Sequence, residues 1–148
     1  MDIYDYLEMD HKKVDQLFKQ FKKAPNKERQ MEIIQFLGQE LLVHAKSEEK
    51  TFYQTLSQHQ RTKEQAVHGR KEHHEIEDKT KQLLTTKNKE HQLKKEVETL
   101  QDLVEHHVSD EEGKIFRKAK QVLSDEDALI LKEMMHREKQ KLLRQHLK

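Results

Sequence analysis

Apolar residues recur every three or four positions along most of the chain, and this spacing places them on one face of an α-helix. The first such stretch runs from about Ile3 to Lys23. The sequence Ala24, Pro25, Asn26 ends it, because proline disfavours helical geometry in the residue before it. Asn26 is also a good N-cap, so we expect a second helix to begin directly after it.

Three further stretches follow with the same spacing. The second helix carries its apolar positions from Met31 to Leu56 and fades in a polar run at 57–63. The third, which is the least apolar, extends from about 66 to 84 and ends near 85–88, and the fourth carries its stripe from 97 to 119. Ser124, with Asp127 three residues on, resembles a capping box and predicts a fifth helix at about 125–146.

Four main helices with short links predict an all-α protein, an antiparallel up-and-down four-helix bundle with an additional C-terminal helix on an end or flank. Composition agrees, because three glycines, one proline and many Glu, Lys, Gln and Leu favour helices over sheets. The charged fraction of 39% could also indicate disorder, but disordered chains lack such periodic apolar residues. We expect a single domain over 1–148, with its core bundle at about 3–120.

Charge and composition exclude several classes of function. A formal net charge of +1 provides no long-range field for nucleic acid or an anionic membrane. The absence of cysteine excludes disulfides, thiolate metal sites and cysteine nucleophiles. No apolar stretch is long enough for a signal peptide or a membrane span, so we expect a cytoplasmic protein, and we expect it to be a monomer.

Histidine is over-represented, with 11 of 148 residues. A metal site in a bundle must be built from side chains on the buried stripes, so the helical phase of each histidine matters. His and Glu four residues apart point the same way from a helix and can reach one ion. Each main helix has one histidine in phase with its apolar residues, and two helices add a glutamate: His11, His44 with Glu48, His73, and His107 with Glu111.

Taken singly, each of these residues is better interpreted as a hydrogen-bonded core histidine or part of a solvated face. Jointly that interpretation fails, because four imidazoles and two carboxylates in a small core would cost several kcal/mol per unpaired group. A bound cation removes the penalty. Nitrogen and carboxylate ligands without thiolates suit iron or manganese, and zinc less well, while bridging carboxylates suit a two-metal cluster.

The same residues belong to two repeated motifs. An acidic residue followed by His-x-x-(Val or Ile) occurs at 10–14 and 72–76, and His-x-x-x-Glu-Glu followed by an aromatic residue occurs at 44–52 and 107–116. Together they resemble the hemerythrin-like HHE cation-binding domain over roughly residues 3–120. The resemblance implies a centre of two non-haem iron ions with an oxo or hydroxo bridge. It further implies bridging carboxylates from Glu48 and Glu111 and terminal ligands from His11, His44, His73 and His107.

One feature departs from the family. The oxygen-carrying hemerythrins of marine invertebrates place two histidines four apart on the third helix, whereas His68 and His73 are five apart here and the residue four before His73 is Gly69. A fifth histidine ligand is therefore missing from its expected place, which argues against efficient oxygen transport. Whether His68 coordinates stays open.

The remaining polar residues have simpler interpretations. His74 and His106 stand beside His73 and His107, so a one-residue error in register would exchange them. Glu49 and Glu112 either support the ligands or lie exposed. His59, His91, His136 and His146 fall in polar stretches and are expected to be solvated. The segment 132–148 holds six Lys or Arg against two Glu, which predicts a solvated helix, with a docking surface as the alternative.

Three functions fit such a centre. The first is a di-iron protein that binds oxygen, nitric oxide or an azide-like small anion for sensing, storage or scavenging. The second is an enzyme that consumes peroxide or nitric oxide or repairs iron centres, and the third is an iron-handling or structural bundle. We favour a ligand-binding protein over an enzyme, with a small molecule rather than nucleic acid or membrane as its partner.

Overall fold

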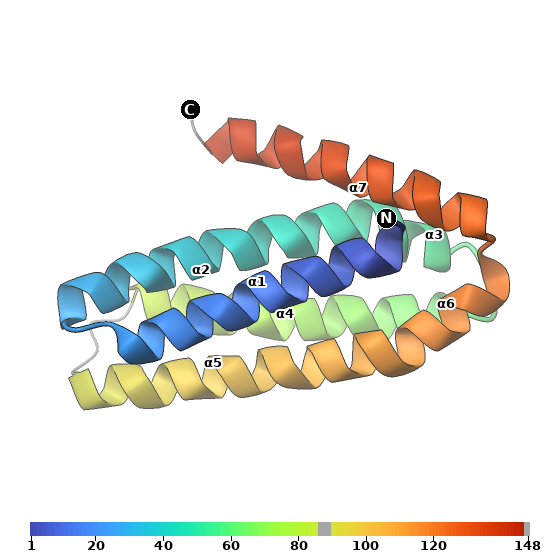
Figure 1. Ribbon diagram of the computed structural model, residues 1–148. Helices are drawn as coiled ribbons and strands as arrows, with labels where there is room; N and C mark the ends of the chain where they lie inside the picture. The colour runs from blue at the N-terminus through green and yellow to red at the C-terminus, as the bar shows by residue number, and fades with distance from the viewer. Residues whose placement is uncertain (86–89, 147–148) are drawn as a thin grey trace.

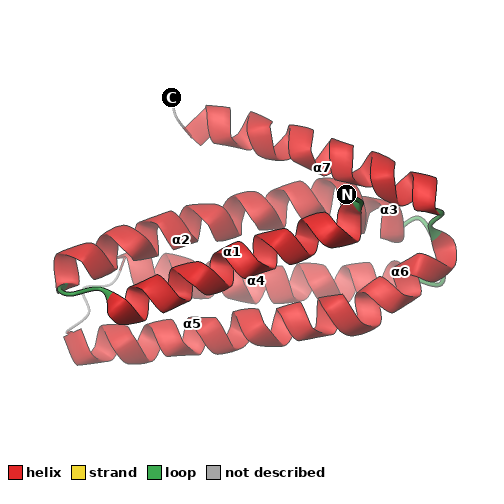
Figure 2. Ribbon diagram, in the orientation of Figure 1, coloured by secondary structure: helices red, strands yellow, loops and turns green. Residues whose placement is uncertain are grey.

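The computed structural model describes residues 1–85 and 90–146, and every regular element in this part of the chain is helical (Figure 2). Four long helices form an antiparallel bundle, and a further long helix lies along one side of it (Figure 1). The bundle helices are α1 (Ile3–Lys23), α2 (Lys27–Glu48), α4 (Lys63–Thr85) and α5 (Glu90–Asp110). The remaining elements are η1 (Glu49–Tyr53), α3 (Gln54–Leu56), η2 (Glu111–Ile115), α6 (Phe116–Val122) and α7 (Asp125–His146). The predicted fold class is confirmed.

Local capping explains where the helices begin. The Asn26 side chain accepts a hydrogen bond from the backbone N–H of Arg29 at 2.9 Å, which satisfies one free donor at the start of α2. Ser124 and Asp127 bond reciprocally to each other's backbone N–H at 3.0 and 2.9 Å. The predicted capping box therefore starts α7. No helix in the described ranges is long and apolar enough to cross a membrane.

The apolar interior is divided into two clusters. One lies toward the end of the bundle where α7 begins, and includes Ile3, Tyr4, Leu7, Phe52, Ile115, Phe116 and Met135. The other fills the opposite half and includes Val14, Phe18, Phe21, Ile34, Leu37, Leu83, Leu93 and Leu100. Buried polar residues occupy the layer between them: Asp10, His11, His44, Glu48, Glu72, His73, His107 and Glu111.

The second and fourth helices are not the uninterrupted α-helices that the sequence predicted. Each contains a π-helical turn directly at its His-x-x-x-Glu-Glu motif, η1 after Glu48 and η2 from Glu111. A π turn holds more residues than an α turn, so it shifts the phase of everything that follows. In η1 it buries three successive side chains, Thr51, Phe52 and Tyr53.

Candidate metal centre

Histidine and glutamate side chains from all four bundle helices meet in the polar layer. The structure brings together the six residues that the sequence singled out, each at most 8% exposed. They are His11 on α1, His44 and Glu48 on α2, His73 on α4, His107 on α5 and Glu111 at the start of η2. Their neighbours in the two doublets, His74 and His106, point outward and are exposed.

Each glutamate lies between two histidines. Oε1 of Glu48 is 3.2 Å from Nε2 of both His44 and His73. The carboxylate of Glu111 is 3.1 Å from His11 Nε2 through Oε1 and 3.6 Å from His107 Nε2 through Oε2. These atoms form two overlapping groups that share Glu111, and within each group they lie within 4.8 Å of one another. The arrangement can hold cations with a carboxylate common to both groups.

Most of these atoms have no hydrogen-bond partner. Nε2 of all four histidines, both carboxylate oxygens of Glu48 and Oε1 of Glu111 are buried and have no hydrogen-bond partner. Buried polar atoms are almost always paired, and each unpaired one costs about 1–3 kcal/mol. Because these atoms face one another, a cation between them would satisfy them together. The donor set therefore fits a metal site.

The opposite ring nitrogen of each histidine contacts a carboxylate. His44 Nδ1 is 2.8 Å from Asp10 Oδ2, and His107 Nδ1 is 2.9 Å from Glu72 Oε1. Asp10 and Glu72 are the acidic residues that precede His11 and His73 in the first motif. An Nδ1–H bond of this kind fixes the ring and leaves Nε2 free to bind a metal.

The second glutamate of each Glu-Glu pair does the same for the other two histidines. Glu112 Oε2 lies 2.6 Å from His11 Nδ1, and Glu49 Oε2 lies 3.2 Å from His73 Nδ1. Both glutamates therefore support a histidine, and Glu112 is exposed as well, so both of the alternatives that the sequence left open apply to it. The acidic residue before each histidine of the first motif, and both glutamates of each Glu-Glu pair, thus either face the interior of the centre or orient one of its histidines.

The carboxylates of the centre raise the pKa values of two of its histidines. Burial alone would lower the pKa of His11, but Glu111 and Glu112 outweigh it and raise the pKa to about 10. Burial likewise opposes the charge on His73, whose pKa is raised to about 10 by Glu48 and Glu49. The carboxylates thus favour a positive charge inside the cluster, which a proton or a metal ion can supply. A metal would displace these protons, so binding is expected to release protons.

Comparison with known proteins agrees with this geometry. The family model of the Hemerythrin HHE cation binding domain matches residues 2–119. The chain belongs to this family. A solved structure of an HHE cation-binding domain-containing protein from Mycobacterium kansasii superposes with a TM-score of 0.84 at 23% identity, covering 96% of this chain and 87% of that one. None of the curated proteins matches. The match to the family model ends at residue 119, before α7 begins.

A tyrosine fills the space that a side chain at position 69, four residues before His73, would occupy. The fully buried Tyr53 packs its ring against Gly69, where a Cβ would lie only 2.4 Å from Tyr53 Cζ. Its hydroxyl donates a hydrogen bond to Glu111 Oε2. Sequence phase missed Tyr53, because five residues of α-helix would turn it about 140° away from Glu48. The π turn of η1 brings it back to the inner face.

Other histidines lie outside the centre. His68 is exposed and contacts Asp110 at 3.3 Å instead of the six central residues. His59 is half-buried, and the side chains of His91 and His146 lie outside the described residues. The expectation for His136 needs correction, because its Nδ1 lies 3.0 Å from the hydroxyl of Tyr6 in the interface between α1 and α7.

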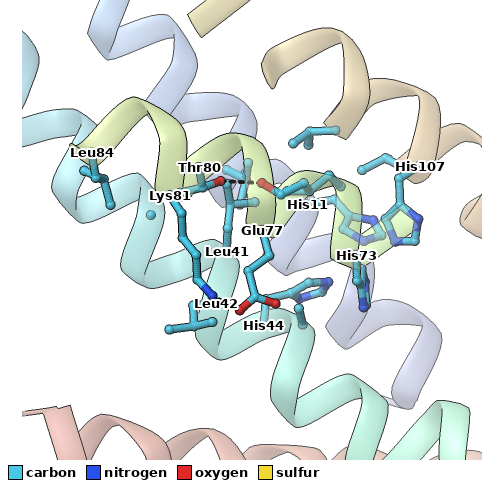
Figure 3. Close-up of a pocket in the computed structure, with 16 residues that line it drawn as sticks. His11, Leu41, Leu42, His44, His73, Glu77, Thr80, Lys81, Leu84 and His107 are labelled. Atoms are coloured by element: carbon cyan, nitrogen blue, oxygen red, sulfur yellow. Dashed lines mark hydrogen bonds and ion pairs between the residues drawn. The ribbon is translucent and has the colours of Figure 1, made fainter. Parts of the chain in front are cut away.

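An apolar cavity of about 100 Å³ reaches the centre between α2 and α4. The histidines lie together at one end of it, and Leu84 lies at the other (Figure 3). Its walls are largely aliphatic, with Leu41, Ile76 and Val104 among them. Such a space suits a small, weakly polar molecule better than a large substrate.

Proposed function

We propose that this HHE domain is a cytoplasmic non-haem di-iron protein that binds oxygen, nitric oxide or a related small ligand for sensing, storage or scavenging. The observation that carries the proposal is the set of buried, unpaired Nε2 and carboxylate atoms that face one another. In this proposal the metal ligands are His11, His44, Glu48, His73, His107 and Glu111.

The donor set supports two iron ions. It contains imidazoles and carboxylates and no thiolate, which suits iron or manganese. Six protein ligands exceed what one ion takes while leaving room for a substrate, and the two groups of donors share Glu111. We therefore expect about two iron atoms per chain. Protein reconstituted anaerobically with ferrous iron and then desalted should retain them, whereas one iron or none would contradict the di-iron assignment.

Ligand counting supports an open position. Two six-coordinate irons offer about twelve positions, of which a bridging oxygen and two bridging carboxylates take about six. Four histidines fill four of the rest, and His68, which contacts Asp110, lies away from the centre. About two positions would remain for an exogenous ligand, and the apolar cavity reaches the four histidines.

Azide binding tests this function. Titration of the diferric protein with azide should produce a new ligand-to-metal charge-transfer band that saturates. The absence of any spectral change at saturating azide would mean that the coordination sphere is closed, and small-ligand binding would give way to storage or structure. Reversible spectral change with oxygen or nitric oxide, without multiple turnover, would distinguish a binding protein from an enzyme.

One observation favours the enzyme as the second candidate. Tyr53 places a buried phenol against Glu111, and a phenol so placed can donate a proton to a reaction at the centre. If the protein consumes peroxide or nitric oxide over many turnovers, Tyr53→Phe should slow turnover while iron content stays near that of the wild type. Equal rates in both proteins would remove the argument for this alternative.

A further inference from the structure

A second group of metal-ligand side chains lies on the outer surface between α4 and α5. His68 and Glu72 are one helical turn apart on α4, and His106 and Asp110 are one turn apart on α5. His68 Nε2 is 3.4 Å from Glu72 Oε2 and 3.3 Å from Asp110 Oδ2. His106 Nε2 is also 3.4 Å from Glu72 Oε2 and 3.3 Å from Asp110 Oδ2. Both imidazoles therefore face the same two carboxylate oxygens.

Hydrogen bonding alone accounts poorly for this group. Each imidazole directs one nitrogen at both oxygens, but a single N–H can point well at only one of them. Two carboxylates also stand side by side, which requires positive charge between or beside them.

We propose that His68, Glu72, His106 and Asp110 form an outer binding site for one divalent transition-metal ion, of which zinc is the best match. Two imidazoles and two carboxylates without a thiolate are a donor set that zinc accepts in four-coordinate sites. Facing pairs of His and carboxylate four residues apart can reach one ion from two helices. The histidine side chains are 53% and 71% exposed, so the ion is accessible from solvent.

The outer site is joined to the buried centre through one carboxylate. Glu72 contacts His107 Nδ1 through Oε1 and faces the outer histidines through Oε2. Glu72 thus lies between the outer metal and His107, a proposed iron ligand, but none of the four outer residues belongs to the inner six. Binding of zinc here should leave the iron in place.

Titration of the iron-loaded protein with zinc, followed by calorimetry and metal analysis, tests the proposal. The wild type should bind one additional zinc per chain without releasing iron, and X-ray absorption at the zinc edge should show imidazole ligands. The double variant His68→Ala/His106→Ala should weaken this binding by more than about 10-fold, since even a lost orienting group costs about 10–100-fold in metal affinity. His74→Ala, another exposed histidine of α4, should bind zinc like the wild type.

Each contrary result overturns the proposal. The proposal fails if the iron-loaded protein binds no zinc, or if it binds zinc only while it releases iron. It also fails if the double variant binds zinc as tightly as the wild type. Because both replaced histidines are exposed, their truncation leaves no buried cavity, and circular dichroism of each variant checks that it is folded. Iron content measured in the same samples shows separately whether the inner centre has formed.

Discussion

Lys139 of the added helix α7 forms a buried ion pair with Asp10 of α1. The other carboxylate oxygen of Asp10 contacts Nδ1 of His44, so the C-terminal helix is connected to the centre through a single carboxylate. Lys139 is 9% exposed and its Nζ lies 4.8 Å from the centre of the Tyr6 ring. The prediction that the basic segment 132–148 is solvated is wrong at this residue.

Lys139→Met should destabilise the protein by about 3 kcal/mol, because removal of one partner of a buried ion pair leaves the other charge uncompensated. Equilibrium denaturation in urea measures the loss. Asp10→Asn in the same chain should recover part of it, because the unpaired charge is then gone.

Lys132→Met is the matched control for Lys139→Met. Lys132 also lies on α7 near the Tyr6 ring, but its ion pair with Glu133 is more exposed, so the expected loss is below about 1 kcal/mol. Equal losses of unfolding free energy in the two variants would show that the ion pair of Lys139 with Asp10 stabilises the fold no more than an exposed ion pair does.

The two glutamates of each pair should differ in their effect on iron. Glu48→Ala and Glu111→Ala should lose the cluster, because these side chains are fully buried between the histidines. Glu49→Ala and Glu112→Ala should keep most of the iron, with affinity lower by about 10–100-fold, because each removes only the orienting partner of one histidine. Iron content after desalting against a chelator would reveal the difference. Similar retention in all four variants would disprove the proposed ligand assignment.

Metal removal should lower thermal stability. An ion that binds only the native state at about 1,000 times its dissociation constant stabilises that state by about 4 kcal/mol. For a chain of this length that corresponds to a rise of about 10 °C in melting temperature. Calorimetry of the iron-free and iron-loaded protein measures the shift, and identical melting temperatures would mean that the metal is peripheral to the bundle.

Alkaline titration should find no tyrosine with an ordinary pKa. Burial, with a smaller effect from acidic neighbours, raises the pKa of both Tyr4 and Tyr6 to about 12, and burial also raises that of Tyr53. The folded state therefore favours the neutral phenol. The resulting stability is fully present below about pH 10, the pKa of an unfolded tyrosine, and is lost as pH rises through about 12.

Phenolate absorbance measured against pH tests this expectation. In the folded protein it should rise only near pH 12, together with the loss of helical circular dichroism. In denaturant it should rise near pH 10, as for free tyrosine. A transition near pH 10 in the folded protein would show that at least one phenol is accessible to solvent.

The sequence predicted the features that depend on the geometry of a single helix: where it begins and ends, and which of its side chains face the interior. The first helix spans Ile3–Lys23 as expected, and Asn26 and Ser124 act as the caps that their positions indicate. The six residues chosen by phase meet in the interior, because the periodicity of an α-helix is a local property that can be counted along the sequence.

Residues whose role depends on a distant partner were not predictable in this way. Lys139 and Asp10 are 129 positions apart, and no pattern in the sequence indicates that they pair. Tyr53 was missed because the π turn of η1 contains more residues than an α turn and therefore changes the direction in which Tyr53 points. His68, weighed as a fifth ligand, instead faces His106 across α4 and α5.

The sequence by itself determined that the chain forms long amphipathic helices with a histidine on the inner face of each bundle helix, since periodicity and capping act within a few residues. Only the tertiary structure decided which carboxylate orients each histidine, where Tyr53 points and how α7 reaches the centre. Those contacts join helices that are far apart in sequence. They depend on how the helices pack, which side-chain phase alone does not specify.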